Sequence, residues 1–201
     1  TDFSSLFFGI PGDTDEGIFR YDHNNNRFEM RTNATAAGVG LNIDSGNRVG
    51  IGTATPQYEL EVASTTAADI VMTRKDDSIG DGDVIGQLSW VMVDADLSTD
   101  RDVTAGIKTV ATQTHDGANF GSELIFMASD DTSSSLSNIM TLLGSGNVGI
   151  GTDSPNALLE LDQGASDVAI MKFVSSDVGH AMTDHVEADV FGAIKKFSDV
   201  G

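Results

Sequence analysis

A phrase that occurs twice in the chain constrains its fold more than any other feature of the sequence. The copies are GNRVGIGTATPQYELEV at 46–62 and GNVGIGTDSPNALLEL at 146–161, and from the first valine onward they align without a gap, so that Pro155 lies 99 positions after Pro56. A repeat of long period is typical of an array of similar units. Each copy places two glycines around one isoleucine and continues through a threonine and a proline into a short alternating apolar segment. This pattern predicts a strand, a sharp turn and a second strand rather than a catalytic loop.

The residues of this phrase that we expect to matter most are structural. Glycine permits backbone conformations and close approaches that other residues resist, and proline fixes its own φ. The predicted structural positions are Gly50, Gly52, Pro56, Gly149, Gly151 and Pro155. We therefore expect a substitution such as Gly151→Val to be disruptive.

Composition narrows the range of partners. The 201 residues include 31 acidic and 11 basic side chains, and the formal net charge of −20 repels phosphate backbones and anionic lipid surfaces. The absence of cysteine excludes disulfides, zinc–thiolate sites and thiol catalysis. No apolar run is long enough to span a bilayer as a helix. The sequence therefore predicts neither a nucleic-acid partner nor insertion into a membrane.

Residues that usually fill a core are scarce. Aromatic residues make up 6% of the chain, which also contains 22 glycines. Large apolar side chains supply most of the burial in a self-sufficient domain, so we expect neighbouring chains to supply part of it here. The sequence opens on Thr1 rather than Met and stops just after a new strand-like segment. We therefore also expect it to be part of a longer polypeptide.

Alternation of apolar and polar residues predicts strands along most of the chain. On both sides of the Asn-rich centre 24–26 it predicts a hairpin over 18–32, with Phe19, Tyr21, Phe28 and Met30 on one face and Arg20, Arg27, Glu29 and Arg31 on the other. Further strands are predicted at 41–44, 58–62, 69–74 and 168–174, and a four-stranded antiparallel meander at 84–93, 103–112, 121–128 and 138–143. The tail 180–197 has both helical and strand periodicity, and for it we predict a loop or short helical turn followed by a strand.

This organisation predicts five modules. They are an N-terminal β-hairpin module at 1–45, the first phrase with its connecting strands at 46–75, an antiparallel β domain at 76–145, the second phrase with its strand at 146–176, and the start of a further unit at 177–201.

The phrase GNVGIGTDSP with its following strand, and the upstream hairpin RYDHNNNRFEMRTN, resemble segments that recur in bacteriophage tail fibres and related fibre-like proteins. The block from Asp76 to Leu143, with its GIKT and ELIFMAS strands, resembles the domain often found between two such phrases. The tail is similar to the opening of a unit that often follows, so the resemblance covers most of residues 17–197. The phrase alone also occurs in bacterial surface proteins and in carbohydrate-active fibres. Its occurrence together with the hairpin and the β block is more specific.

The resemblance implies an all-β fold: an elongated, intertwined, parallel homotrimer with small antiparallel β domains along a shaft. In such a trimer Ile51 and Ile150 would meet their symmetry mates near the axis. The resemblance also implies an extracellular structural protein of a virion tail fibre. It would contact other tail or baseplate proteins and support attachment, through distal parts, to a host cell-surface receptor such as a glycan. The chain departs from the pattern in its strong acidity and in ending within a unit.

Two groups of aspartates are candidate Ca²⁺ ligands, because this cation takes carboxylate and backbone oxygens. The groups are Asp76, Asp77, Asp81 and Asp83, and Asp94, Asp96, Asp100 and Asp102. Their spacing lacks the order of an EF-hand and its final glutamate, so we interpret both as solvated acidic turns.

Histidines offer a second candidate metal site. His180 and His185 could bind a transition metal near a threefold axis, but five residues apart they need not share a face. We interpret them as surface or interfacial residues, and His23 and His115 as solvated residues. The sequence predicts no metal and no cofactor.

Catalytic patterns are weak. A glycosidase needs two carboxylates about 5 to 9.5 Å apart, which so acidic a chain can meet by chance. Aromatic platforms for sugar are limited to Trp90, Tyr21 and Tyr58 beside the phenylalanines, and we interpret Trp90 as a core residue. No Gly-x-Ser-x-Gly elbow is present. The nearest match, LGSGN at 143–147, belongs to the repeat phrase and is interpreted as a turn. The sequences GVG at 38–40 and GIG at 50–52 are not followed by the lysine or helix that cradles phosphate.

We therefore predict a structural protein rather than an enzyme. Two alternatives remain open at the level of sequence. One is a bacterial or archaeal surface adhesin or appendage built from the same module, and the other is a fibre-borne polysaccharide depolymerase.

Overall fold

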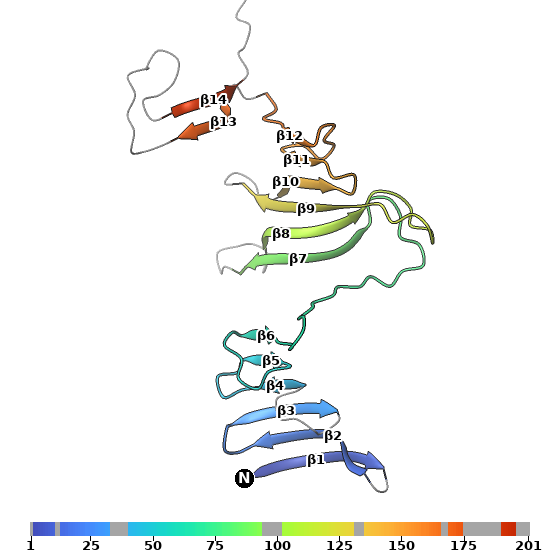
Figure 1. The fold of residues 1–201 in the computed structure, drawn as a ribbon, viewed down its shortest axis with the longest axis vertical. Coiled ribbons are helices and arrows are strands. Elements are labelled where there is room, and N and C mark those ends of the chain that lie inside the picture. Colours follow the sequence, from blue (N-terminus) through green and yellow to red (C-terminus); the bar gives the residue numbers. More distant parts are fainter. Residues whose placement is uncertain are drawn as a thin grey trace, which may run out of the picture. The chain divides into compact units, whose positions relative to one another are not determined.

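The computed structural model describes residues 2–10, 13–32, 40–93, 102–130, 135–165, 169–174 and 190–195. Every regular element in these ranges is a strand, which confirms the all-β prediction (Figure 1). The same ranges contain no helix with the length and apolarity that a membrane span requires. The chain divides into two compact units, Thr1–Val71 and Met72–Gly201.

The first unit is a six-stranded sheet whose strands lie side by side in chain order. They are β1 (Phe3–Ile10), β2 (Asp13–Asp22), β3 (Arg27–Thr32), β4 (Leu41–Ile43), β5 (Val49–Ile51) and β6 (Leu60–Val62). Neighbours from β1 to β5 are antiparallel, and β5 and β6 are parallel. The predicted hairpin is confirmed as β2 and β3, and Asn26 has φ 48° in its turn, a conformation that asparagine adopts more readily than most residues.

The second unit contains a sheet of the same plan. Its strands are β7 (Val84–Met92), β8 (Asp102–Ala111), β9 (Ser122–Ser129), β10 (Leu136–Leu143), β11 (Val148–Ile150) and β12 (Leu159–Leu161). The first four confirm the predicted antiparallel meander, and β11 and β12 are parallel. A separate antiparallel pair consists of β13 (Ala169–Val174) and β14 (Val190–Lys195). The strand predicted for the tail is therefore confirmed, and the turn predicted before it lies outside the described residues.

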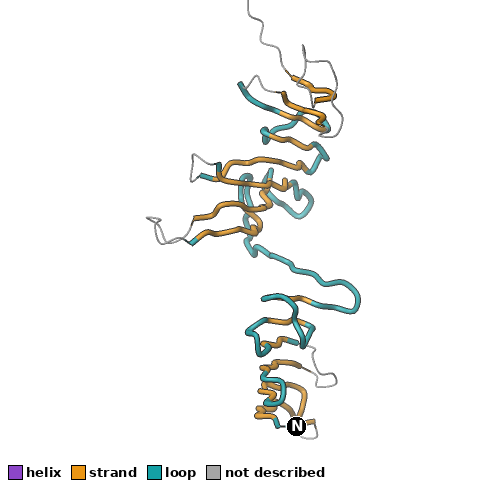
Figure 2. The backbone as a smooth tube through the Cα atoms, turned by 90° about the vertical axis from the view of Figure 1, so that its left-hand side faces the viewer, coloured by secondary structure: helices purple, strands orange, loops and turns teal. Residues whose placement is uncertain are grey.

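One predicted strand is wrong. Residues 69–74 have no regular structure (teal in Figure 2), and the side chains of Ile70 and Val71 are 76% and 78% exposed. β-branched residues favour a strand only where a neighbouring strand and a packing surface receive them. Within one chain, no described strand pairs with this segment.

The sequence repeat is also a structural repeat. Asn42 pairs with Gly50 and Thr141 with Gly149, so β4 to β6 and β10 to β12 have the same register. The offset of 99 extends without a gap into the preceding turn, where Asn47 (φ 61°) corresponds to Gly146 (φ 94°). Positive φ is tolerated by asparagine and glycine, which explains why the two turns differ in sequence and agree in conformation.

In each copy, the loop between the two parallel strands crosses one face of the sheet. These crossing loops are residues 52–59 and 151–158. A Cβ atom on Gly50 would lie 2.4 Å from the carbonyl oxygen of Thr53, and a Cβ atom on Gly149 would lie 2.4 Å from that of Thr152. Pro56 and Pro155 are buried. We call the face beneath each crossing loop the covered face and the opposite one the open face.

A buried hydroxyl on the covered face of the second unit gives a first testable prediction. Thr141 is fully buried, and its Oγ1 atom has no hydrogen-bond partner among the described residues. Leaving a buried polar group unpaired costs about 1–3 kcal/mol. We expect Thr141→Val to raise the free energy of unfolding by about 1 kcal/mol, measured by thermal or denaturant unfolding. Thr141→Ser keeps the hydroxyl and removes the methyl group, so it should lower stability. A Thr141→Val variant less stable than wild type would contradict the conclusion that this hydroxyl is buried without a hydrogen-bond partner among the described residues.

The buried apolar core is small. Among the described residues the buried hydrophobic side chains are Ile18, Val110, Ala111, Ile125 and Met127. Val110, Ile125 and Met127 pack together on the covered face of the second sheet. Most large apolar side chains therefore lie outside this core, on the open faces of the two sheets.

Candidate assembly face

Burial in the hairpin is the reverse of what a soluble monomeric sheet shows. Glu29 is 2% exposed, whereas its neighbours Phe28 and Met30 are 44% and 52% exposed. An antiparallel sheet usually turns its apolar face to the core and its polar face to water. Here the charged side chain lies on the covered face, and the apolar ones lie on the open face.

The apolar face extends over all six strands of the first unit. Register places Leu6, Phe19 and Met30 in one cross-strand row, and each step to the next strand keeps side chains on the same face. We call this set the first open face: Leu6, Phe8, Phe19, Tyr21, Phe28, Met30, Leu41, Ile43, Val49, Ile51, Leu60 and Val62. Of the side chains that the structure describes on it, none is charged.

The second sheet has a matching apolar face. The second open face consists of Leu88, Trp90, Ile107, Leu124, Phe126, Met140, Leu142, Val148, Ile150, Leu159 and Leu161. Trp90 is 51% exposed, so its interpretation as a core residue is wrong for a single chain. It lies at the margin of a sheet face that nothing within the described chain covers fully.

The two open faces share their plan residue by residue. Six positions on the strands of the phrase correspond at the offset of 99, and all are apolar in both copies. The pairs are Leu41 and Met140, Ile43 and Leu142, Val49 and Val148, Ile51 and Ile150, Leu60 and Leu159, and Val62 and Leu161. Contiguous exposed apolar surface on a soluble protein marks an interaction site. In a chain of net charge −20, two faces without a described charge are the strongest candidate for such a site.

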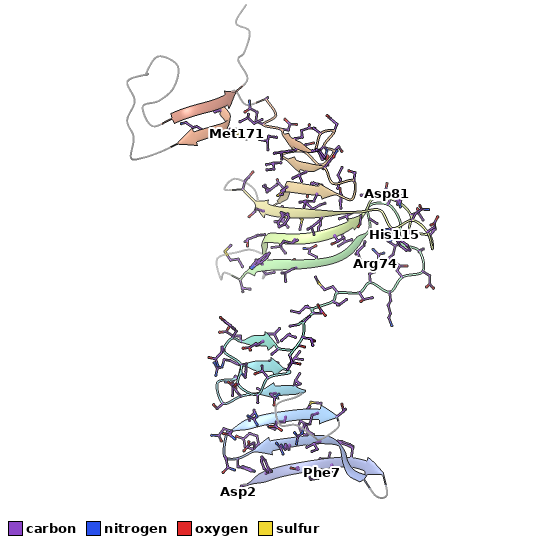
Figure 3. The ribbon with its side chains drawn as sticks, in the orientation of Figure 1. Asp2, Phe7, Arg74, Asp81, His115 and Met171 are labelled. Atoms are coloured by element: carbon purple, nitrogen blue, oxygen red, sulfur yellow. The ribbon has the colours of Figure 1, made fainter. Side chains whose placement is uncertain are left out.

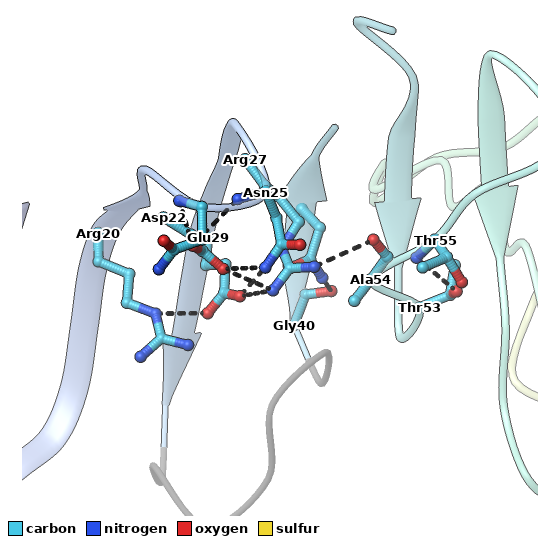
Figure 4. Close-up of polar contacts among 11 residues, drawn as sticks. Arg20, Asp22, Asn25, Arg27, Glu29, Gly40, Thr53, Ala54 and Thr55 are labelled. Carbon is cyan, nitrogen blue, oxygen red and sulfur yellow. Dashed lines mark hydrogen bonds and ion pairs between the residues drawn. The ribbon is translucent and has the colours of Figure 1, made fainter. Parts of the chain in front are cut away.

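The covered face of the first sheet holds a group of ion pairs (Figure 4). The Arg20 Nε atom donates to Glu29 Oε2 at 2.7 Å, and Arg27 donates to Glu29 Oε1. Arg27 also lies 3.6 Å from Asp22 and donates to the carbonyl oxygen of Ala54 in the crossing loop at 3.4 Å. Burial raises the pKa of Glu29, but the hydrogen bonds from Arg20 and Arg27 outweigh it and hold that pKa below its ordinary value. Arg20 and Glu29 thus join the two strands of the hairpin, and Arg27 ties the hairpin to the crossing loop.

This carboxylate predicts a specific acid sensitivity. Because the pKa of Glu29 is lower in the folded protein than the ordinary value of 4.5, its ionisation stabilises the fold above about pH 4.5, and that contribution is lost as the pH falls below it. Glu29→Gln leaves Arg20 without its counter-charge and Arg27 with Asp22 alone, at 3.6 Å, and should cost about 2–4 kcal/mol at pH 7. Melting curves between pH 3 and pH 7 should show a smaller acid-induced loss for the variant than for wild type. An identical pH dependence would mean that Glu29 does not carry this effect.

Two of the four aspartates in the first group are bound to the same arginine. Arg74 contacts Asp76 at 2.6 Å and Asp83 at 3.1 Å, and Asp83 accepts a hydrogen bond from the backbone of Gly80 at 2.8 Å. Figure 3 shows Arg74 and Asp81 in this loop region of the second unit. Asp76 and Asp83 therefore use their carboxylates to bind Arg74, and Asp83 also stabilises the turn at Gly80. The side chains of Asp77 and Asp81 are exposed. Among the described residues, no three His, Cys, Asp or Glu side chains are grouped so that they could hold a metal ion.

The remaining candidates are dispersed. His23 Nε2 lies 2.9 Å from Ser4 Oγ, and His115 Nε2 lies 3.0 Å from the carbonyl oxygen of Gly121. Tyr58 is 70% exposed and lies on a crossing loop. Asp102 begins β8. Residues 38, 39, 94, 96, 100, 180 and 185 lie outside the described residues, so the structure does not place those parts of the predicted sites.

Comparison with known proteins adds no family assignment. No model of a known protein family matches the chain. A search of curated proteins also found no match.

Proposed function

We propose that this chain is a structural segment of a viral tail fibre, in which the open faces of parallel copies pack against one another around a common axis. The observation that carries the proposal is the pair of apolar faces on which the structure describes no charged side chain, on sheets whose described charged side chains lie on the covered side. Burying such faces between copies removes apolar surface from water, which contributes a favourable free energy of about 25 cal/mol per Å². Association between copies would then supply the core that one chain lacks.

The repeat favours a second copy of this chain over an unrelated partner. Any partner must cover two faces that share six apolar positions at an offset of 99 residues. A parallel copy in register offers each face its own counterpart, which is the condition for closed rotational symmetry. The copy number of three comes from the resemblance of the phrase, the hairpin and the β block to trimeric fibres.

The proposed role is mechanical and non-enzymatic. A trimeric shaft would space and stiffen the fibre, and several fibres on one particle would convert weak contacts with a host-surface glycan into avidity. The partners would be other tail or baseplate proteins at one end and the receptor, through distal parts, at the other. The location would be the virion, outside the cell.

Light scattering on the whole chain tests the assembly. We expect a mass three times that of the 21.1 kDa chain, with tighter association at high salt because salt screens repulsion between copies that each carry a formal charge of −20. A stable monomer at both low and high salt would overturn the proposal.

Labelling and activity assays separate the alternatives. Antibodies raised against the chain should label appendages on virus particles and block adsorption to the host. Labelling of cell-surface filaments instead would support the adhesin or appendage. Release of oligosaccharides from host capsule on incubation with the chain would support the depolymerase and contradict a purely structural role.

A further inference from the structure

The segment between the two sheets has apolar side chains and an unpaired backbone. From Ala67 to Thr73 no residue makes a hydrogen bond, ion pair or ring contact with any other part of the chain that the structure describes. Ile70 and Val71 are more than three-quarters exposed. Long connections without secondary structure are uncommon in compact domains and often have a function. The composition of 69–74 nevertheless favours a strand, which needs a partner to form.

The end of this segment already lies on the second open face. A Cβ atom on Gly86 would be 3.3 Å from the Cβ atom of Met72, and Met72 lines an apolar groove of about 300 Å³ together with Leu88, Ile107 and Leu124. Arg74 Nη1 donates to the carbonyl oxygen of Val84 at 3.0 Å. The chain therefore enters the proposed interface between copies at Met72, and the preceding residues are continuous with it.

The same sheet offers an open strand edge. β7 pairs only with β8 among the described strands, so its outer edge has no strand partner, and of its carbonyl groups only that of Val84 accepts from Arg74. Its sequence VIGQLSWVM contains neither a charged residue nor a proline, which are the devices that usually protect an edge from pairing with another chain. Addition of an extended segment to such an edge is a recurrent mode of recognition.

We propose that residues 67–72 of one copy form a strand on the outer edge of β7 of a neighbouring copy. This inference rests on the assembly proposed above, because it requires a second copy at the second open face. It accounts together for the strand-forming composition of the segment, its exposure in the single chain, and the unprotected edge of β7. The partner is another molecule of this chain, joined through backbone hydrogen bonds and through Ile70 and Val71.

Isotope-resolved cross-linking tests the exchange. A photoreactive benzoylphenylalanine in place of Val71 would be introduced into chains grown with ¹⁴N and with ¹⁵N, and the two would be unfolded, mixed and refolded. We expect cross-links to residues 84–92 that join light and heavy chains. A trimer whose cross-links lie only within single chains, or only outside 84–92, would overturn the strand exchange and leave the assembly standing. A monomer would overturn the assembly and the exchange with it.

A pair of proline variants tests the backbone pairing. Val71→Pro removes a backbone donor within the proposed strand, whereas Thr65→Pro changes the same connection outside it. We expect Val71→Pro to raise the dissociation constant about tenfold or more and Thr65→Pro to leave it unchanged. Hydrogen exchange should show alternate amides between Ala67 and Met72 protected in the wild-type assembly, because an added strand pairs with β7 on one side only. Unprotected amides in an intact trimer, or equal effects of the two prolines, would contradict the proposal.

Discussion

Leu159→Glu is expected to convert the assembled protein into folded monomers. Leu159 is 55% exposed and lies on the second open face, beside its register partner Val148 of β11. In a single chain the new carboxylate would stay in water. In the assembly each copy would bury one uncompensated charge, and removing an ion from water without a partner costs several kcal/mol. The dissociation constant should rise by about three powers of ten or more, measured by light scattering over a concentration series.

The adjacent residue provides a matched control. Leu158 is 80% exposed and ends the crossing loop of the second unit, where its carbonyl oxygen accepts from Val148. Because successive side chains alternate along a strand, its side chain points away from the open face that Leu159 joins. Leu158→Glu makes the same chemical change one position away and should leave the mass unchanged. Circular dichroism should show strand content preserved in both variants. A Leu159→Glu trimer as stable as wild type would contradict the assignment of the open face as the interface.

The first unit allows an independent repetition of this experiment. Leu60 occupies the corresponding position in the first copy of the phrase and is 58% exposed. Leu60→Glu should therefore also weaken association. Dissociation by Leu159→Glu alone would show that only the second open face contributes to the interface.

Local patterns predicted most of the strands. In the hairpin and the meander, period-two alternation and turn-forming residues lie close together in the sequence, so each strand and its partner are indicated by neighbouring residues. β1 was not predicted, because its sequence FSSLFFGI has little alternation. The segment 69–74 was predicted as a strand and is not one in the single chain, because strand propensity does not supply a partner.

Alternation also does not determine which face of a sheet is buried. It correctly placed Phe28 and Glu29 on opposite faces, but only the crossing loop shows that the glutamate side is the covered one. The ion pairs of Arg20 and Arg27 with Glu29 bring together residues of two strands, and the hydrogen bond from Arg27 to Ala54 adds a distant loop. Such an arrangement depends on the path of the crossing loop, which the strand pattern does not indicate.

The glycines of the phrase were predicted to be structural, and the structure supplies the reason within one chain. Gly50 and Gly149 lie beneath the crossing loops, where a side chain would collide with a carbonyl oxygen. Gly52 and Gly151 have φ angles of 78° and 79°. Close approach between copies is therefore not needed to explain these four positions.

Gly151→Val is expected to be the most damaging single substitution in the phrase. Gly151 has φ 79°, a region in which a β-branched residue is strongly disfavoured. A Cβ atom there would also lie 2.1 Å from the carbonyl oxygen of Asp162, just after β12. Backbone strain alone costs about 1–3 kcal/mol, and the collision forces β11 and β12 apart. We expect a total loss of about 3 kcal/mol or more, measured by thermal unfolding and by the yield of assembled protein.

Two other glycines separate the causes. Gly146 has φ 94° with no atom within 4 Å of its would-be Cβ, so Gly146→Val carries the backbone strain without the collision. Gly149→Ala carries a collision, 2.4 Å from Thr152, at a position whose φ is not positive. Gly151→Val should exceed both in its effect, because it combines strain with contact at the joint between the parallel strands. If Gly146→Val lowered the melting temperature as much as Gly151→Val, the contact with Asp162 would contribute nothing, and backbone conformation alone would explain this glycine.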